Sequence, residues 1–184
     1  MNNPVIDWFG KSFAELHPML QDLHRNGGEL TGTVNLEFGS GISGVIGRKL
    51  AAKLGLPSNA GNHDFKVLIT HKNGSLYWYR QFDLKHKMVS VFTPHGNYPT
   101  GYWSETTGKL SLILGVKIFE GGWHWVQRKI KFMGISMPLW LFPSSHAYKQ
   151  IKNEMYEFSV TLKILIIGKL LSYSGKLLPH ATLV

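Results

Sequence analysis

The chain contains no cysteine and no apolar stretch long enough to form a membrane-spanning helix. The absence of cysteine excludes a disulfide framework, a thiolate nucleophile and a cysteine-based zinc site. The longest apolar stretch, Phe158 to Ile167, contains Lys163 and is far shorter than the roughly 20 residues that such a helix requires. The first residues, MNNPVIDWFGKSF, lack a basic segment followed by an apolar one. We therefore expect no secretory signal and a cytoplasmic location.

Acidic residues are scarce relative to basic ones, and the imbalance is greatest in the second half of the chain. The sequence has 20 Lys and Arg against 11 Asp and Glu, which gives a formal net charge of +9. Residues 109–184 hold ten of these basic residues and only three of the acidic ones. The cations are spread through strand-like segments and form no cluster of the kind that binds nucleic acid. This spread disfavours a nucleic-acid partner and leaves an anionic membrane surface or a solvated sheet face as alternatives.

The length and composition fit one domain with a sizeable core. Hydrophobic residues make up 43% of the 184 residues, and no linker or internal repeat interrupts them. We predict a single domain over 1–184, with a helical segment at 1–28, a strand, turn and helix at 29–56, and antiparallel strands over 64–177. In the helical segment, Ser12 and Glu15 have the spacing of a capping box, and we expect Pro18 to begin a second helix.

The most specific short motif is G-x-G-x-x-G, formed by Gly39, Gly41 and Gly44. It follows a strand-like run at 29–38 and precedes a helix-like run, and Asp64 lies 20 residues beyond Gly44, as in a dinucleotide-binding fingerprint. The strand argues against a cofactor, because its apolar and polar residues alternate, whereas the first strand of a Rossmann fold is buried on both faces. We therefore predict no bound cofactor. We interpret Gly39 and Gly41 as positive-φ residues of a strand-to-helix turn, and Gly44 as a position of close helix packing.

Most of the remaining sequence alternates with the period of a β-strand. Asn73-Gly74 is a hairpin signal, and Thr107-Gly108 and Gly121-Gly122 indicate further turns. About nine strands and two or three early helices predict an α+β protein built on one large antiparallel sheet. A sheet of this size curls into a half-barrel or a closed barrel, and either can enclose an apolar cavity. The expected strands are 29–38, 65–70, 76–84, 88–92, 102–106, 109–120, 123–133, 155–166 and 169–175.

Two arginines occupy strand positions where a charge is costly. Arg80 falls on the same strand face as Trp78, and Arg128 falls on the same face as Ile130. A buried guanidinium must be paired and hydrogen-bonded. Each arginine is therefore either part of a structural ion pair, with Glu105 as the partner, or an anchor for a ligand carboxylate or phosphate. The candidate ligand-binding residues are Arg80, Glu105, Arg128, Trp78 and Trp103.

The sequence shows no motif for metal binding or for a particular reaction. The nine histidines include no H-x-H or H-E-x-x-H spacing, and there is no G-x-S-x-G nucleophile elbow. We therefore predict no metal site and assign no reaction. Trp123 and Trp125 fall on the same strand face as Lys129 and Lys131. This face is either an aromatic and basic platform, which would bind single-stranded nucleic acid or a membrane surface, or a partly covered face of the sheet.

Several short motifs follow one another between Phe13 and Leu177. They are F-x-x-L-H-P at Phe13 to Pro18, G-x-V-x-x-x-x-G-x-G at Gly32 to Gly41, W-x-R-x-F at Trp78 to Phe82, E-x-x-G at Glu105 and Gly108, the loop Leu139–Pro143, and Y-x-G at Tyr173 and Gly175. In this order they resemble a bacterial family of unknown function, whose members occur alone or C-terminal to saccharopine-dehydrogenase-like or short-chain-dehydrogenase-like domains. The resemblance implies no known activity, but it implies an oxidoreductase as a partner. Leu165 stands where members of that family tend to have proline.

These observations predict a non-catalytic accessory domain that binds a small apolar or acidic ligand, or a lipid, inside a curved sheet. Two alternatives remain. One is an enzyme that uses the same cavity for a reaction that the sequence does not reveal. The other is a membrane-surface or protein-docking module that uses the basic C-terminal half.

Overall fold

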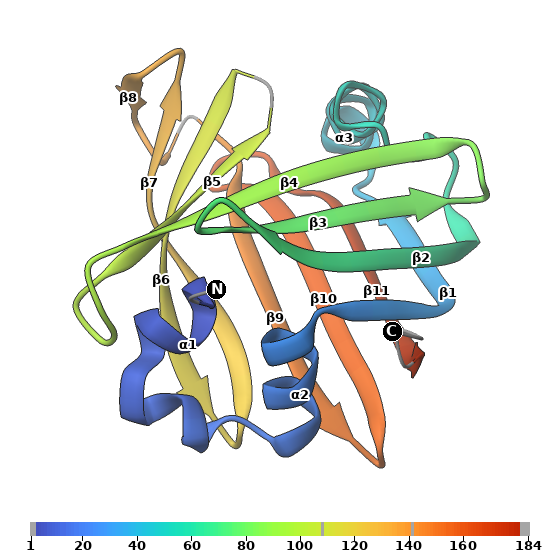
Figure 1. Cartoon of the computed structure of the whole chain (residues 1–184). Coiled ribbons are helices and arrows are strands. Elements are labelled where there is room, and N and C mark those ends of the chain that lie inside the picture. Colours follow the sequence, from blue (N-terminus) through green and yellow to red (C-terminus); the bar gives the residue numbers. More distant parts are fainter. Residues whose placement is uncertain (1–2, 108, 141, 181–184) are drawn as a thin grey trace.

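The computed structural model describes residues 3–107, 109–140 and 142–180. Within these residues the chain forms eleven strands, three α-helices and one 3-10 helix (Figure 1). Gly108, the second residue of one predicted turn, and Leu141, in the predicted loop at 139–143, lie outside the described residues. The elements are α1 (Pro4–Phe9), η1 (Gly10–Glu15), α2 (Pro18–Asn26), β1 (Gly28–Phe38), α3 (Gly41–Leu54), β2 (Gly61–Lys72), β3 (Ser75–Phe82), β4 (His86–His95), β5 (Tyr102–Thr107), β6 (Leu110–Phe119), β7 (Gly122–Phe132), β8 (Ile135–Met137), β9 (Ser144–Lys152), β10 (Met155–Ile164) and β11 (Gly168–His180).

The strands form a closed antiparallel barrel. Ten of them follow one another in the order β6-β5-β4-β3-β2-β1-β11-β10-β9-β7, and β7 also pairs with β6, which closes the ring. The short strand β8 lies beside the end of β7 and outside the ring. The prediction of an α+β protein with a barrel-like antiparallel sheet is confirmed, and of its two forms the closed barrel is present. The predicted strand number was too low, because β8 and β9 were not recognised.

β9 was missed because its inward-facing positions carry only one large apolar side chain. Its sequence, SSHAYKQIK, alternates between the two faces, and the inward positions are Ser145, Ala147, Lys149 and Ile151. The alternation of large apolar residues by which strands are recognised is therefore absent. The strand nevertheless pairs with β10 over its whole length and with the first half of β7.

The glycine motif forms a corner between antiparallel strands and a helix. β1 pairs with β2 and with β11, both antiparallel, so the strand arrangement of a dinucleotide-binding fold is absent around this motif. Only Gly41 of the three has a positive φ, at 56°. A Cβ atom on Gly39 would lie 2.0 Å from the carbonyl oxygen of Lys169, and one on Gly44 would lie 2.1 Å from that of Gly39. The positive φ predicted for Gly39 was wrong, since that glycine is required for space.

α3 crosses one end of the barrel, shown at the upper right of Figure 1. The helix packs on β11 through small residues, since Ser43, Gly44, Gly47 and Ala51 are its buried positions. Leu50 and Leu54 instead line the interior cavity described below. None of the helices in the described part of the chain is long and apolar enough to cross a membrane.

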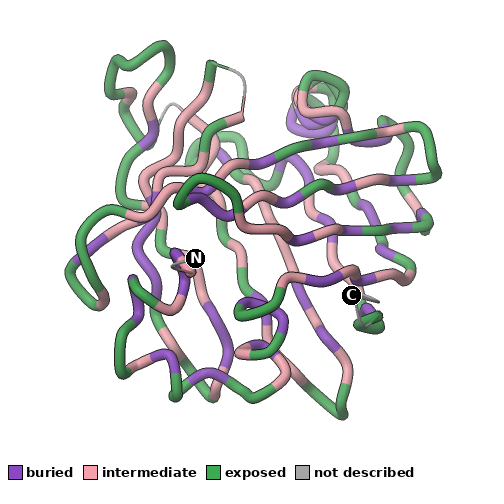
Figure 2. Tube along the Cα trace, in the orientation of Figure 1, coloured by how far each residue is buried: buried purple, intermediate pink, exposed green. Residues whose placement is uncertain are grey.

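The N-terminal helices cover the opposite end of the barrel, at the lower left of Figure 1. The side chain of Asn3 accepts hydrogen bonds from the N–H groups of Val5 and Ile6 and so caps α1. Pro18 begins α2, as predicted, and Nδ1 of His17 accepts a hydrogen bond from the backbone of the next turn. Ser12 lies inside η1 and caps no helix, so the predicted capping box was wrong. Figure 2 shows buried positions on α1 and α2 where they face the barrel, and exposed turns at both ends of the molecule.

Replacing Gly47 with alanine tests the close packing of α3 on the barrel. A Cβ atom at this position would lie 2.0 Å from the carbonyl oxygen of Leu170. Alanine favours a helix over glycine by about 1 kcal/mol, but overpacking of this kind costs about 1–3 kcal/mol. We therefore expect Gly47→Ala to lower the free energy of unfolding in urea. Lys49→Ala, on the exposed face of the same helix, should leave it nearly unchanged. An equal or higher stability of Gly47→Ala would contradict the close contact.

Candidate ligand-binding cavity

The barrel encloses one large cavity with a mostly apolar wall. Its volume is about 650 Å³, within the range of roughly 300–1,000 Å³ that is typical of small-molecule sites. The exposed side chains in its lining include Lys53 of α3, Lys109 between β5 and β6, and Phe132 at the end of β7, so the cavity opens at the end of the barrel that α3 crosses. The apolar wall includes Leu112, Leu114, Trp125, Ile130, Tyr156, Phe158, Val160, Leu162 and Leu171.

Arg80 is a buried charge in the cavity wall. Its side chain is 7% exposed, its Nη1 donates a hydrogen bond to Oγ of Ser90 at 2.8 Å, and its guanidinium lies 5.0 Å from the ring centre of Trp78. In the part of the chain that the structure describes, no carboxylate lies within 4.0 Å of this guanidinium. The predicted ion pair with Glu105 is therefore absent. Glu105 is half-buried and lines the same cavity.

Two buried tyrosines lie in the electrostatic field of Arg80. Burial raises the pKa of Tyr156 and of Tyr173, and the positive charge of Arg80 opposes this rise at both. The charge of Glu105 raises the pKa of Tyr173 further. Both phenols are therefore neutral at physiological pH and keep a hydroxyl group that can donate a hydrogen bond.

Lys149 is the most deeply buried basic side chain of the cavity. Its sequence pattern did not distinguish it from the other cations of residues 109–184. It is 1% exposed, and its Nζ lies 2.6 Å from Nε2 of His24 on α2, which is hydrogen-bond distance. The same Nζ lies 3.8 Å from the ring centre of Trp123 and 4.5 Å from that of Trp78. Among the described residues, no carboxylate forms an ion pair with it.

Burial without a carboxylate changes the protonation of this pair. Desolvation, with a further effect of the Arg80 charge, lowers the pKa of Lys149 well below its ordinary value. Desolvation, followed by the charge of Lys149, likewise lowers the pKa of His24. The aromatic rings favour the ammonium form of Lys149, but they do not replace the hydration that an ammonium group loses on burial. An anionic group placed beside Lys149 would raise its pKa again.

Of the five candidate ligand-binding residues, three line the cavity and two lie outside it. Trp78, Arg80 and Glu105 line the cavity. Trp103 is fully buried and packs edge-on against Trp8 of α1, with 5.4 Å between the ring centres, so it belongs to the core near the helical end of the barrel. Arg128 is exposed, and its Nη1 donates a hydrogen bond to the carbonyl oxygen of Thr100 at 3.0 Å. Neither of these two side chains is part of the cavity lining.

A β-bulge at Arg128 explains why the expected alternation of β7 was wrong. Leu114 of β6 pairs with Gln127, and the preceding residue pairs with Lys129, so Arg128 has no partner on β6. The extra residue exchanges the two faces of the strand beyond it. Trp123 and Trp125 therefore face the interior, whereas Lys129 is exposed, so of the two alternatives for this strand the platform of tryptophans and lysines does not form.

One sequence signal for Lys149 existed, although it was weak. Lys149 falls on the same strand face as Ala147 and Ile151, and its strand lies directly before the strongly alternating run of β10. Once β9 is paired with β10, the register places Lys149 opposite Phe158, whose side chain faces the interior. The sequence alone offers no means of fixing that register, because the polar residues of β9 suit either face.

Comparison with protein-family models gives a match over most of the chain. A family model with the description "Domain of unknown function (DUF4166)" matches residues 16–177. The match runs from the end of η1 to the last strand. No curated protein and no solved structure matches the chain.

Replacing Lys149 with methionine should stabilise the protein. Between the lowered pKa of Lys149 in the folded chain and its ordinary value of 10.5, the unfolded chain binds a proton that the folded chain does not. The stability of the unsubstituted protein therefore falls as the pH drops through that interval. We expect Lys149→Met to raise the free energy of unfolding by about 1–3 kcal/mol at neutral pH, and the gain should shrink as the pH rises towards 10.5.

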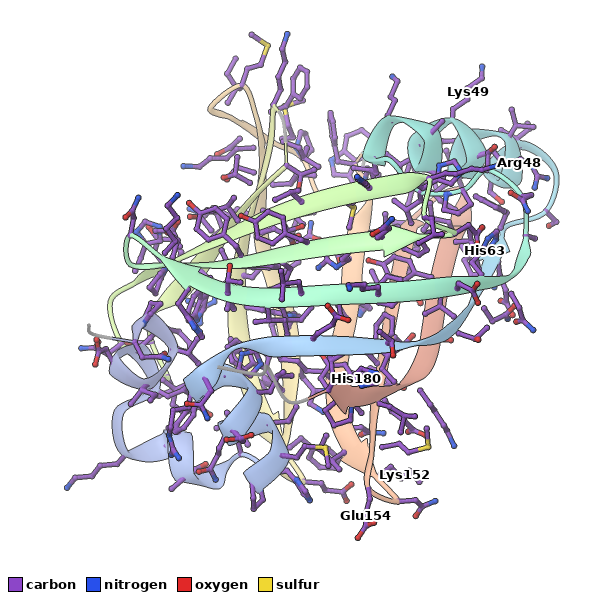
Figure 3. All side chains as sticks on the ribbon, turned by 45° about the vertical axis from the view of Figure 1, so that its right-hand side comes forward. Arg48, Lys49, His63, Lys152, Glu154 and His180 are labelled. Atoms are coloured by element: carbon purple, nitrogen blue, oxygen red, sulfur yellow. The ribbon has the colours of Figure 1, made fainter. Side chains whose placement is uncertain are left out.

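Urea denaturation at neutral and alkaline pH measures this difference. Lys152→Met is the matched control, because Lys152 lies on the same strand but is exposed at the turn before Glu154 (Figure 3). It should change the stability by less than about 0.5 kcal/mol at either pH. A loss of stability in Lys149→Met at neutral pH would contradict this expectation, because the contacts of Lys149 with His24 and the tryptophan rings would then outweigh the cost of its burial.

Proposed function

The chain belongs to the family described as Domain of unknown function (DUF4166), and we propose that it binds an apolar ligand with an anionic head group inside its barrel. The apolar part of the ligand fills the cavity. Its carboxylate or phosphate group lies between Arg80 and Lys149. This is a binding role and requires no reaction.

The observation that carries this proposal is the presence of two buried basic side chains in a cavity whose described lining supplies one carboxylate. Arg80 and Lys149 are both almost completely buried, and Glu105 is the one acidic residue among the described residues of the lining. A buried charge is costly unless it is paired. Among the described residues Glu105 forms no ion pair with Arg80 or Lys149, and an anionic head group would supply the partner that the two basic side chains lack.

The remainder of the cavity suits a hydrocarbon chain or a small ring system. The wall beyond the two cations consists mainly of leucine, isoleucine, valine and aromatic side chains, and the volume of about 650 Å³ accommodates a ligand of that kind. Burial of apolar ligand surface contributes roughly 25 cal/mol per Å², so most of the affinity would come from the apolar part. The charged groups would fix the orientation.

Catalysis in the same cavity is a second candidate, and the contact between Lys149 and His24 favours it. A lysine whose pKa is lowered by burial is a nucleophilic amine, and a neutral histidine at hydrogen-bond distance can transfer its proton. Native mass spectrometry of the protein purified from its host distinguishes the two roles. A retained ligand that is lost on denaturation supports binding, and a covalent adduct on Lys149 supports catalysis.

Three further expectations from the sequence stay predictions. They are the cytoplasmic location, the bacterial origin of the family, and the oxidoreductase partner that the family resemblance implies. Fractionation of host cells tests the location, and cross-linking in those cells followed by mass spectrometry tests the partner.

Replacing Arg80 with glutamine should weaken ligand binding without unfolding the protein. A charge-assisted hydrogen bond is worth about 1.5–3 kcal/mol, so the affinity for laurate, measured by calorimetry, should fall by about ten- to a hundredfold. Arg128→Gln is the matched control, since that arginine lies outside the cavity, and it should bind laurate like the unsubstituted chain. Unchanged affinity in both Arg80→Gln and Lys149→Met would overturn the proposal. If Arg80→Gln fails to fold, Arg80 is structural, and the second variant decides.

Laurate affinity should fall as the pH rises, because binding takes up a proton. The groups that act on Lys149 are His24 at 2.6 Å, whose own pKa is lowered, and Arg80, whose charge contributes to the lowered pKa of Lys149. A bound carboxylate raises the pKa of Lys149 above its value in the empty cavity. The affinity is therefore full below the pKa in the empty cavity and decreases as the pH rises towards the pKa in the complex. Calorimetry from about pH 7 to about pH 10 should show this decrease, and Lys149→Met should abolish it. An equal slope in the variant would assign the effect to another group.

A further inference from the structure

Exposed apolar side chains gather at the end of the barrel where the cavity opens. Ile135 in β8 is 69% exposed, Trp140 in the segment before β9 is 54% exposed, and Leu165 and Ile166 in the β10–β11 turn are 77% and 74% exposed. Ile42 near the start of α3 is 76% exposed. Each of them lies in or beside a turn, or at the start of a helix, and none lies on a flat strand face.

These segments adjoin one another around the cavity opening. The N–H group of Met133 donates a hydrogen bond to the carbonyl oxygen of Lys109, which joins the β7–β8 turn to the β5–β6 turn. Oγ of Ser144 donates a hydrogen bond to the carbonyl oxygen of Lys163, which joins the start of β9 to the end of β10. Figure 1 shows the β7–β8 hairpin, the β5–β6 turn and α3 at the same end of the barrel.

Basic side chains occur in the same segments as the apolar ones or in neighbouring segments. Figure 3 shows Lys49 on α3 projecting away from the barrel. Cations of this end include Arg48, Lys49, Lys53, Lys109, Lys131 and Lys163. Among the described residues, none of these forms an ion pair, whereas Lys169 at the start of β11 is paired with Glu37.

This combination fits a lipid bilayer better than a folded protein partner. Apolar tips on separate turns can enter the boundary between head groups and acyl chains, and tryptophan is favoured at that depth. Lysine and arginine beside them attract anionic head groups. A stable protein interface instead needs a contiguous apolar centre, which separate turn tips do not provide.

We propose that this end of the barrel docks on an anionic lipid bilayer with the cavity opening towards the membrane. The proposal rests on the ligand-binding role above. Docking in this orientation supplies the route by which an apolar ligand passes between bilayer and cavity without crossing water. The opening lies among the docking segments, since Lys53, Lys109 and Phe132 belong both to its lining and to this end of the barrel.

Co-sedimentation with vesicles tests the proposal. The vesicles contain three parts phosphatidylcholine to one part phosphatidylglycerol, and the variant carries Ile135→Ser, Trp140→Ser and Leu165→Ser together. We expect the unsubstituted chain to bind these vesicles, and the variant to bind at least about tenfold more weakly. Pure phosphatidylcholine vesicles, or added salt, should weaken binding of the unsubstituted chain by a similar factor.

The matched control replaces exposed apolar residues at the other end of the molecule. Phe119, the last residue of β6, lies before the turn that contacts the N-terminal helices and is 61% exposed, and Leu178, near the end of β11, is 54% exposed. Phe119→Ser with Leu178→Ser should bind the vesicles like the unsubstituted chain. An equal loss in this control would overturn the proposal, because the orientation would then be wrong.

Laurate calorimetry on the same proteins separates this inference from the proposed function. The triple variant should bind laurate in solution with unchanged affinity, since its three side chains lie outside the cavity lining. Laurate binding without vesicle binding would overturn the docking alone, and vesicle binding without laurate binding would overturn the proposed function alone. If the unsubstituted chain forms a dimer that the triple variant cannot form, the proposal of bilayer docking is also overturned, since a second copy would then cover this end.

Discussion

The double pairing of β7 is the constraint on which the rest of the structure depends. This strand pairs with β6 along its length, its first half pairs with β9, and its last residues pair with β8. The pairing with both neighbours converts an open sheet into a ring of ten strands, and a closed ring leaves no free edge within it. The diameter of a barrel grows with its number of strands, and the side chains of ten strands do not fill the interior. The cavity of about 650 Å³ follows from this closure.

Closure also decides the electrostatics of the interior. Once β9 lies between β7 and β10, its inward residues face an apolar space covered at one end by the N-terminal helices. Lys149 then has His24 and the tryptophan rings as neighbours instead of water, and its pKa falls. Arg80 reaches the same space from the opposite side of the ring and finds a serine as its hydrogen-bond partner. The proposed anionic ligand would pair with these two buried basic side chains, which have no carboxylate partner among the described residues. The exposed apolar turns around the opening favour a lipid bilayer as its source.

The parts of the fold that the sequence predicted are those in which local pattern and final environment agree. β1 alternates and is antiparallel to both neighbours, Asn73-Gly74 forms the hairpin between β2 and β3, and α3 follows the glycine turn. Where a strand carries polar residues on its inner face, as β9 does with Ser145 and Lys149, the same rules fail. They fail again at Arg128, because an extra residue in β7 exchanges the two faces of the strand and no sequence pattern marks its position.

The sequence by itself determined the antiparallel α+β architecture, the absence of a dinucleotide-binding fold, and the inward position of Trp78 and Arg80, because strand alternation assigns faces within a single element. Only the tertiary structure decided that the sheet closes, that Arg128 lies outside, that Glu105 does not pair with Arg80, and that Lys149 is buried beside His24. These four facts depend on register and on contacts between segments far apart in the chain. Residues 24 and 149 meet only after every strand between them has been placed.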